Sequence, residues 1–297
     1  MNLKSLLTIL TIVPTISSFA HAEMKSELFT GYNGLGFERN DNDFIGTDEA
    51  AKLKTTNLGG YFIKEINDDL SISVLGKYVN FDTSDFTGTE DDTPSETLEI
   101  EASVMKTLAN DSLMSFSGFY ADANTTQESA NASKTMQGYN VSFVNDFNKI
   151  TYMITLGKQT DGSVEAQDTV RNGDYAGLTL SREMNDKLDI GFSYNTFVGK
   201  EYDETVIKTE QTSQVSSLFA QYKLSKGYLQ AGYKIYENER KDVEGSGYGT
   251  SEEADGDAYF LTYSLPFGNA ASKKERMLMM HKPDIVEFST IGGSVGD

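Results

Sequence analysis

The residue types that carry out most enzymatic proton transfers are scarce in this chain. Its 297 residues include no cysteine and only two histidines, His21 and His281. Hydrolysis by a serine or a water needs a base whose pKa lies near neutrality, and histidine is the usual one. His21 belongs to an N-terminal leader and His281 to the C-terminal tail, away from the repetitive middle of the chain. We therefore expect no catalytic residues and predict that the protein is not an enzyme.

Acidic side chains offer the other candidate chemistry. Glu99 and Glu101 stand two positions apart, so on a strand both face the same side. A carboxylate pair can act as acid and base, but hydrophilic lining is the favoured interpretation. Clustered oxygen ligands that suit hard cations occur at residues 40–43, 90–92 and 252–253. Because these clusters lack the ordered spacing of a calcium loop, we expect no metal site, and no motif indicates a cofactor.

The N-terminal segment, residues 1–22, has the composition of a secretory signal peptide. Lys4 precedes an uncharged apolar run from Leu6 to Val13, and the segment ends in Ala20-His21-Ala22, a cleavage-like motif. The run is shorter than the roughly 20 residues of a membrane-spanning helix. We expect residues 1–22 to be removed on export, so that the mature chain begins at Glu23. Without cysteine, the exported protein must be stable without disulfides.

The chain is strongly acidic. Its formal net charge is −20, and loss of Lys4 with the leader makes it −21. A polyanion repels such a chain, so nucleic acid is not an expected partner. The mean hydropathy of −0.41 excludes a helical membrane protein but is compatible with strands in which every second residue is apolar.

Short polar turns recur at nearly regular intervals along the chain, each between two stretches that alternate apolar and polar residues. After the first turn, for example, Ile72, Val74 and Tyr78 alternate with Ser73 and Lys77. The longer connections between these hairpins are acidic. Short turns at one end and long acidic loops at the other are typical of a transmembrane antiparallel up-and-down β-barrel. The turns comprise residues 66–69, 109–112, 145–148, 184–187 and 224–227.

The same pattern predicts twelve strands. Ten are distinct after the first turn, and residues 24–38 and 52–65 form a further hairpin whose two faces are less distinct. The segment from 23 to 267 is long enough for twelve strands and the turns and loops that connect them. An even number also agrees with bacterial single-chain barrels. We therefore divide the chain into a leader (1–22), a barrel (23–267) and a C-terminal periplasmic extension (268–297).

The last predicted strand reads Tyr259-Phe260-Leu261-Thr262-Tyr263-Ser264-Leu265-Pro266-Phe267. It resembles the terminal strand of Gram-negative outer-membrane β-barrels of the porin type, and the resemblance covers residues 23–267. The resemblance implies an outer-membrane location in contact with lipid and lipopolysaccharide. It also implies that the barrel-assembly machinery recognises this last strand. In that group the strand closes the chain, whereas here the sequence continues to Asp297. The implied assembly signal consists of Tyr259, Leu261, Tyr263, Leu265 and Phe267.

The predicted inner face is mostly Ser, Thr, Asn, Gln and Gly. This hydrated, mixed-charge interior predicts a channel for passive diffusion of small hydrophilic solutes or ions, and the acidic outer mouth predicts a preference for cations. The alternative is a closed barrel that acts as an adhesin or a structural surface protein, in which the polar groups pair with one another. The sequence leaves open whether copies form a homo-oligomer. The charged pore-lining candidates are Lys77, Glu99, Glu101, Asp189, Lys223 and Lys234.

The tail from Gly268 to Asp297 lacks strand periodicity and carries balanced charge. Its apolar run, residues 277–280, is compatible with a plug that docks into the periplasmic mouth of the barrel. A partly disordered periplasmic extension is the favoured interpretation, because chain termini are often poorly ordered.

Overall fold

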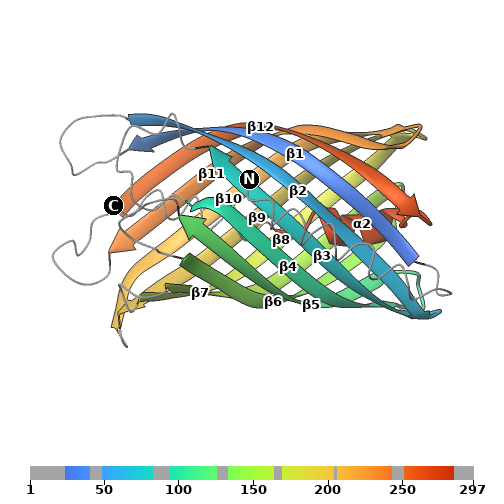
Figure 1. Ribbon diagram of the computed structural model, residues 1–297, viewed down its shortest axis with the longest axis horizontal. Coiled ribbons are helices and arrows are strands. Elements are labelled where there is room, and N and C mark those ends of the chain that lie inside the picture. Colours follow the sequence, from blue (N-terminus) through green and yellow to red (C-terminus); the bar gives the residue numbers. More distant parts are fainter. Residues whose placement is uncertain are drawn as a thin grey trace.

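The computed structural model describes residues 24–40, 49–82, 94–125, 133–163, 169–203, 206–242 and 251–283. Within these ranges the chain forms twelve strands followed by one short helix, α2 (Figure 1). The strands are β1 (Met24–Asn40), β2 (Glu49–Asn67), β3 (Leu70–Asp82), β4 (Pro94–Thr107), β5 (Leu113–Thr125), β6 (Ser133–Phe147), β7 (Ile150–Ser163), β8 (Thr169–Asn185), β9 (Leu188–Asp203), β10 (Val206–Leu224), β11 (Gly227–Asp242) and β12 (Ser251–Gly268).

The strands form a closed barrel in which each pairs with its neighbours in sequence. β1 closes the ring by pairing antiparallel with β12, so that Thr30 lies opposite Tyr263. Closure removes unpaired strand edges, which is what a bilayer requires of a spanning sheet. The predicted twelve-stranded, up-and-down transmembrane barrel is confirmed. Five short turns lie at one end of the barrel, here called the turn end, and the opposite end is called the loop end (Figure 1).

Side chains alternate between the outside and the lumen, as the sequence pattern predicted. On β3, Ile72 and Val74 are exposed on the outer face, whereas Ser73 and Leu75 are buried inside. Small hydroxyl side chains also hydrogen-bond between neighbouring strands on the inner face, which satisfies polar groups that would be costly to bury alone. These pairs are Ser103 with Ser117 (2.8 Å), Ser142 with Thr155 (2.8 Å) and Ser193 with Ser217 (2.6 Å).

Aromatic rings on the inner wall lie over glycines of the neighbouring strand. A Cβ atom added to Gly191 would stand 2.2 Å from the ring of Phe219, which is closer than any real contact. The glycine thus gives the ring room to lie flat against the wall, and the ring covers backbone that would otherwise be exposed. The same arrangement joins Gly59 with Phe29, Gly138 with Phe119, Gly157 with Tyr175, Gly173 with Phe197, and Gly232 with Phe260.

The turn between β6 and β7 shows how short these connections are. Asn148 and Lys149 have φ values of +49° and +67°. Two successive positive φ values are the signature of a type I′ turn, whose twist matches that of the flanking strands. Asparagine is well suited to this conformation, whereas lysine is unusual there, because its Cβ crowds the backbone.

After β12 the chain turns back into the barrel. The backbone of Gly268 has a positive φ, in the left-handed region that favours glycine. The helix α2 (Lys273–Met280) begins with a capping box: the Glu275 amide donates to the Ser272 hydroxyl, and the Ser272 amide donates to the Glu275 carboxylate. α2 lies within the ring of strands near the turn end and packs against β5, β6 and β7 (Figure 1).

The described part of the tail, residues 269–283, lies inside the barrel and is called the plug below, whereas the sequence favoured a partly disordered periplasmic extension for residues 268–297. Leu278 is completely buried, and Met277 and Met279 are nearly so. The tail docks because the inner wall of the barrel provides an apolar surface against which this run is buried. Strand periodicity in the sequence does not reveal such a contact. The expected leader, residues 1–22, and residues 284–297 lie outside the described residues.

In the part of the chain that the structure describes, no helix has the length and apolar character needed to cross a bilayer.

The aromatic–glycine pairs lead to a stability prediction. Gly191→Ala should lower the free energy of unfolding by about 1–3 kcal/mol, because the new methyl group displaces Phe219. Gly76→Ala is the matched control, since a Cβ there meets no described atom within 4 Å. Urea unfolding of the barrel in detergent micelles measures both, and equal stability of the two variants would contradict this role for the pairs.

Candidate functional site

The plug is joined to the barrel by a buried ion pair. Arg276 donates two hydrogen bonds to the two carboxylate oxygens of Glu27 on β1, both at 2.9 Å. Tyr61 donates to the same carboxylate at 2.7 Å, and the guanidinium carbon of Arg276 lies 3.4 Å from the ring centre of Tyr228. Glu27 is only 1% exposed. Such a bidentate pair fixes the orientation of both side chains, and removal of one partner would leave a buried charge unpaired.

Further ion pairs join the tail to widely separated strands. Most of them link a basic residue of the tail to an acidic residue of the wall, so the two surfaces are complementary in charge. The pair between Lys282 and Glu101 is almost completely buried, whereas the exposed pairs contribute less because water screens them. The remaining pairs are Lys25 with Glu275 (2.9 Å), Lys273 with Asp189 (3.1 Å), and Lys274 with Asp111 (2.9 Å) and Asp146 (3.3 Å).

The apolar side of the tail completes the attachment. Met277, Leu278 and Met279 join a single cluster with inward-facing side chains of the barrel. Full burial of a leucine or methionine side chain stabilises by about 1.5–3 kcal/mol. The plug is therefore held by apolar contacts as well as by charge. The wall residues of the cluster are Phe29, Tyr61, Ile63, Leu75, Met105, Val144 and Met153.

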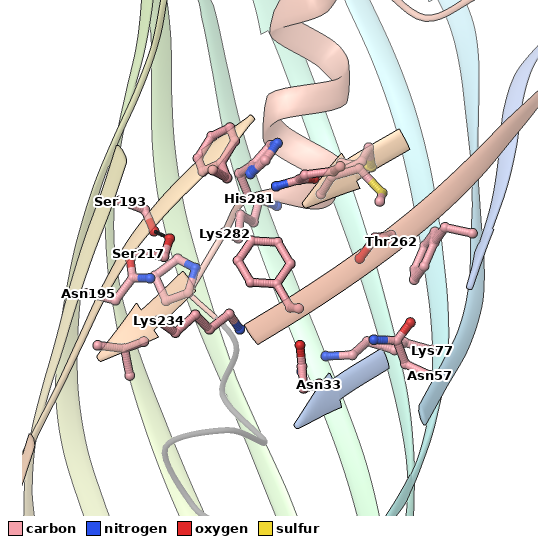
Figure 2. Close-up of a pocket in the computed structure, with 18 of the residues that line it drawn as sticks. Asn33, Asn57, Lys77, Ser193, Asn195, Ser217, Lys234, Thr262, His281 and Lys282 are labelled. Carbon is pink, nitrogen blue, oxygen red and sulfur yellow. Dashed lines mark hydrogen bonds between the residues drawn. The ribbon is translucent and has the colours of Figure 1, made fainter. Parts of the chain in front are cut away.

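Beyond the plug, toward the loop end, the lumen contains a cavity of about 160 Å³. His281 and Lys282, at the end of the tail, lie on one side of it, and Lys234 points into it (Figure 2). The side-chain oxygens of Asn57 and Asn195 are buried and have no hydrogen-bond partner among the described residues. Buried polar atoms of this kind are normally satisfied by water or a ligand. Figure 2 shows further polar residues around the cavity, including Asn33, Lys77, Ser193, Ser217 and Thr262.

A second cavity, of about 220 Å³, lies beside the plug at the turn end. Lys273 and Arg276 of α2 border it on one side, and strands β8 to β11 border it on the other. Polar and charged side chains make up most of its lining residues, so it too can hold water and hydrophilic solutes. The wall residues include Glu183, Asp189, Gln221, Lys223 and Tyr228.

His281 lies between the plug and the inner wall. Its imidazole ring stacks on Phe219, with ring centroids 4.8 Å apart, and its backbone carbonyl accepts a hydrogen bond from Thr179 (3.3 Å). Burial, together with the positive charge of Arg276, lowers the pKa of His281 to about 4. The ring is therefore neutral at physiological pH.

The six predicted pore-lining residues fall into two groups in the structure. Lys77, Glu99, Glu101 and Lys234 border the cavity beyond the plug. Asp189 and Lys223 border the cavity at the turn end.

The residues of the predicted assembly signal lie on β12. Tyr259, Leu261, Tyr263 and Phe267 are exposed on the outer face, and Leu265 is half-buried. Their role in assembly remains a prediction.

The residues that attach the plug could not be identified from the sequence pattern. Glu27 and Arg276 are 249 positions apart, so no local pattern joins them. A weaker signal was present: Ser272 and Glu275 have capping-box spacing directly before an apolar run. The basic residues of the tail, set against an acidic barrel, were a second signal.

Comparisons with known proteins support the fold. No protein-family model matches the sequence, and no curated protein matches it significantly. An outer-membrane channel from Pseudomonas putida F1 is similar in structure, with a TM-score of 0.56 at 9% identity over 83% of this chain and 96% of that chain. OmpT, an outer-membrane protein of Vibrio cholerae, gives 0.39 at 9% identity, over 83% and 99% of the two chains. The Pseudomonas putida toluene transporter TodX gives 0.42 at 9%, over 85% and 91%.

The fold is thus that of Gram-negative outer-membrane β-barrels.

The position of His281 leads to a titration prediction. In a chain that begins at Glu23 it is the only histidine, so its imidazole signals in an NMR spectrum are unambiguous. They should titrate with a midpoint of about 4. Because the undocked ring binds its proton near pH 6.5, docking of the tail should weaken as the pH falls from about 6.5 to about 4. A midpoint near 6.5 in the folded protein would contradict the docked position of His281.

Proposed function

We propose that this protein is an outer-membrane channel for small hydrophilic solutes or ions, whose lumen is narrowed by its own C-terminal helix. The observation that carries the proposal is the polar inner wall with its two cavities, one beyond α2 and one beside it. A barrel with a purely structural role has no need of polar cavities around an internal plug. Within the described residues, His281 is the only histidine, and its ring stacks on Phe219.

The outer face supports the proposed location. Large apolar side chains are exposed on strand after strand, for example Phe116 (56%), Leu156 (60%) and Leu218 (61%). In water such a surface would aggregate, whereas in a bilayer it faces lipid. The turn end then lies in the periplasm, the loops face lipopolysaccharide outside, and the outward residues of β12 serve the assembly machinery. Export through a signal peptide at residues 1–22 belongs to the same proposal.

Charge supports a preference for cations. The chain as a whole carries −20, and acidic residues are concentrated between the strands at the loop end. An acidic mouth raises the local concentration of cations. The tail works against this preference inside the lumen, because Arg276, Lys273 and Lys282 pair with wall carboxylates.

The alternative function is a non-conducting surface barrel. The buried Arg276–Glu27 pair and the apolar cluster around Leu278 favour it, because both attach the plug firmly. If α2 seals the lumen completely, the function lies in the acidic loops, and the protein acts as an adhesin or a structural element.

Conductance in a planar bilayer distinguishes these functions. The refolded chain from Glu23 should give steady single-channel steps with cation preference. Deletion of residues 269–297 should raise the conductance and strengthen the cation preference, because Glu27, Glu101 and Asp189 lose their basic partners. The reversal potential in a salt gradient reports the preference.

A chain that ends at Pro283 is the matched control, since it keeps α2. It should conduct like the complete mature chain. Unchanged conductance after deletion of residues 269–297 would contradict the plug. Silence of every variant, with intact β-structure in circular dichroism, would favour the surface barrel.

A further inference from the structure

The plug does not fill the lumen evenly. The backbone of α2 packs against β5, β6 and β7. On the opposite side the contacts are made by long side chains: Lys273 reaches Asp189 on β9, and Arg276 reaches Tyr228 on β11. The cavity at the turn end lies along this opposite side, and the cavity beyond the plug borders β9, β10 and β11 as well as β1 to β4 and β12.

The two cavities follow one another along the inner face of these strands. On β10, Phe219 borders the cavity beyond the plug and Gln221 borders the cavity at the turn end. On β11, Gln230 borders the cavity beyond the plug and Tyr228 borders the cavity at the turn end. Residues two positions apart on a strand are neighbours on one face, so only one layer of side chains separates the cavities.

That layer consists of two stacked pairs. His281 lies on Phe219, with centroids 4.8 Å apart, and Arg276 lies on Tyr228 at 3.4 Å. In each pair, one partner comes from the tail and the other from the wall. On the β9–β11 side, side chains fill the space between plug and wall. On the β5–β7 side, the backbone of α2 packs directly against the strands.

We infer that hydrophilic solutes pass α2 along the inner face of β9, β10 and β11, through the gap bordered by these stacked pairs. The inference rests on the proposed channel function and specifies its route. Passage requires rotation of the His281 side chain and does not require α2 to leave the barrel. Arg276 can hold Glu27 while the His281 ring moves, because the two residues contact different strands.

Polar side chains line both approaches to the gap. Gln221, Lys223 and Asp189 offer amide, ammonium and carboxylate groups at the turn end. Asn195, Ser193 and Gln230 offer amides and hydroxyls on the other side. A solute that exchanges its hydration water for these groups is small and rich in hydrogen-bonding groups, whereas an apolar solute finds few partners.

The absence of cysteine from the chain allows a direct test. Gln221→Cys places a single thiol on the proposed route in the complete mature protein. A small cationic methanethiosulfonate, added on the turn side of a planar bilayer, should roughly halve the single-channel conductance, because the added group narrows the path. A reducing agent should restore the conductance. Ser115→Cys is the matched control: Ser115 is 1% exposed on β5, against which α2 packs, so the reagent should leave its current unchanged.

Each other outcome decides against the route. If mass spectrometry shows that Gln221→Cys is modified while its current is unchanged, solutes pass elsewhere, although the channel function stands. An equal fall in current for Ser115→Cys would mean that passage is not confined to the β9–β11 side, and the proposed route would be wrong. If the complete chain is silent and the chain without residues 269–297 conducts, the plug seals the lumen and the route is wrong. If neither conducts, the proposed function fails as well.

Discussion

The ion pair between Arg276 and Glu27 joins the end of the chain to its first strand. Glu27 lies on β1, which also closes the barrel by pairing with β12. The pair is buried, so neither charge has water to replace a missing partner. It therefore determines where α2 lies, and the position of α2 in turn determines how the lumen is divided. The two cavities, the stacked His281 and the pairing of Lys273 with Asp189 depend on this position of α2, which the apolar cluster around Leu278 also stabilises.

The inner wall contributes the second constraint. Rings such as Phe219 and Phe260 lie flat over glycines of the next strand, which leaves the lumen wide enough to admit a helix. The same rings present apolar faces to the tail, and the hydroxyl pairs between strands keep the rest of the wall polar. A twelve-stranded barrel encloses less space than the larger porins. A single helix, placed to one side, is therefore enough to divide the lumen into two separate cavities.

The barrel could be predicted from sequence because its signal is local and repeated. Alternation such as that of Ile72, Ser73 and Val74 defines the two faces, and short turns such as residues 145–148 set the strand number. The pore-lining candidates, Lys77 and Glu99 among them, could be assigned to the inner face for the same reason. The plug could not be predicted from the sequence, because its attachment depends on residues far apart in the chain. An eight-residue helix also has little stability of its own in water. Arg276 acquires its role only where the closed barrel brings Glu27 beside it.

Hydrogen exchange at the backbone amides of residues 277–281, in the refolded mature protein, tests the attachment most directly. An isolated helix of this length would exchange within seconds, so slow exchange requires docking. We predict slow exchange in the parent protein and in a Lys158→Met variant, which removes only an exposed ion pair on the outer face. Arg276→Met should lower the protection by about 3–5 kcal/mol, because it leaves Glu27 buried without its partner. Fast exchange in the parent protein, or equal protection in the two variants, would contradict the account.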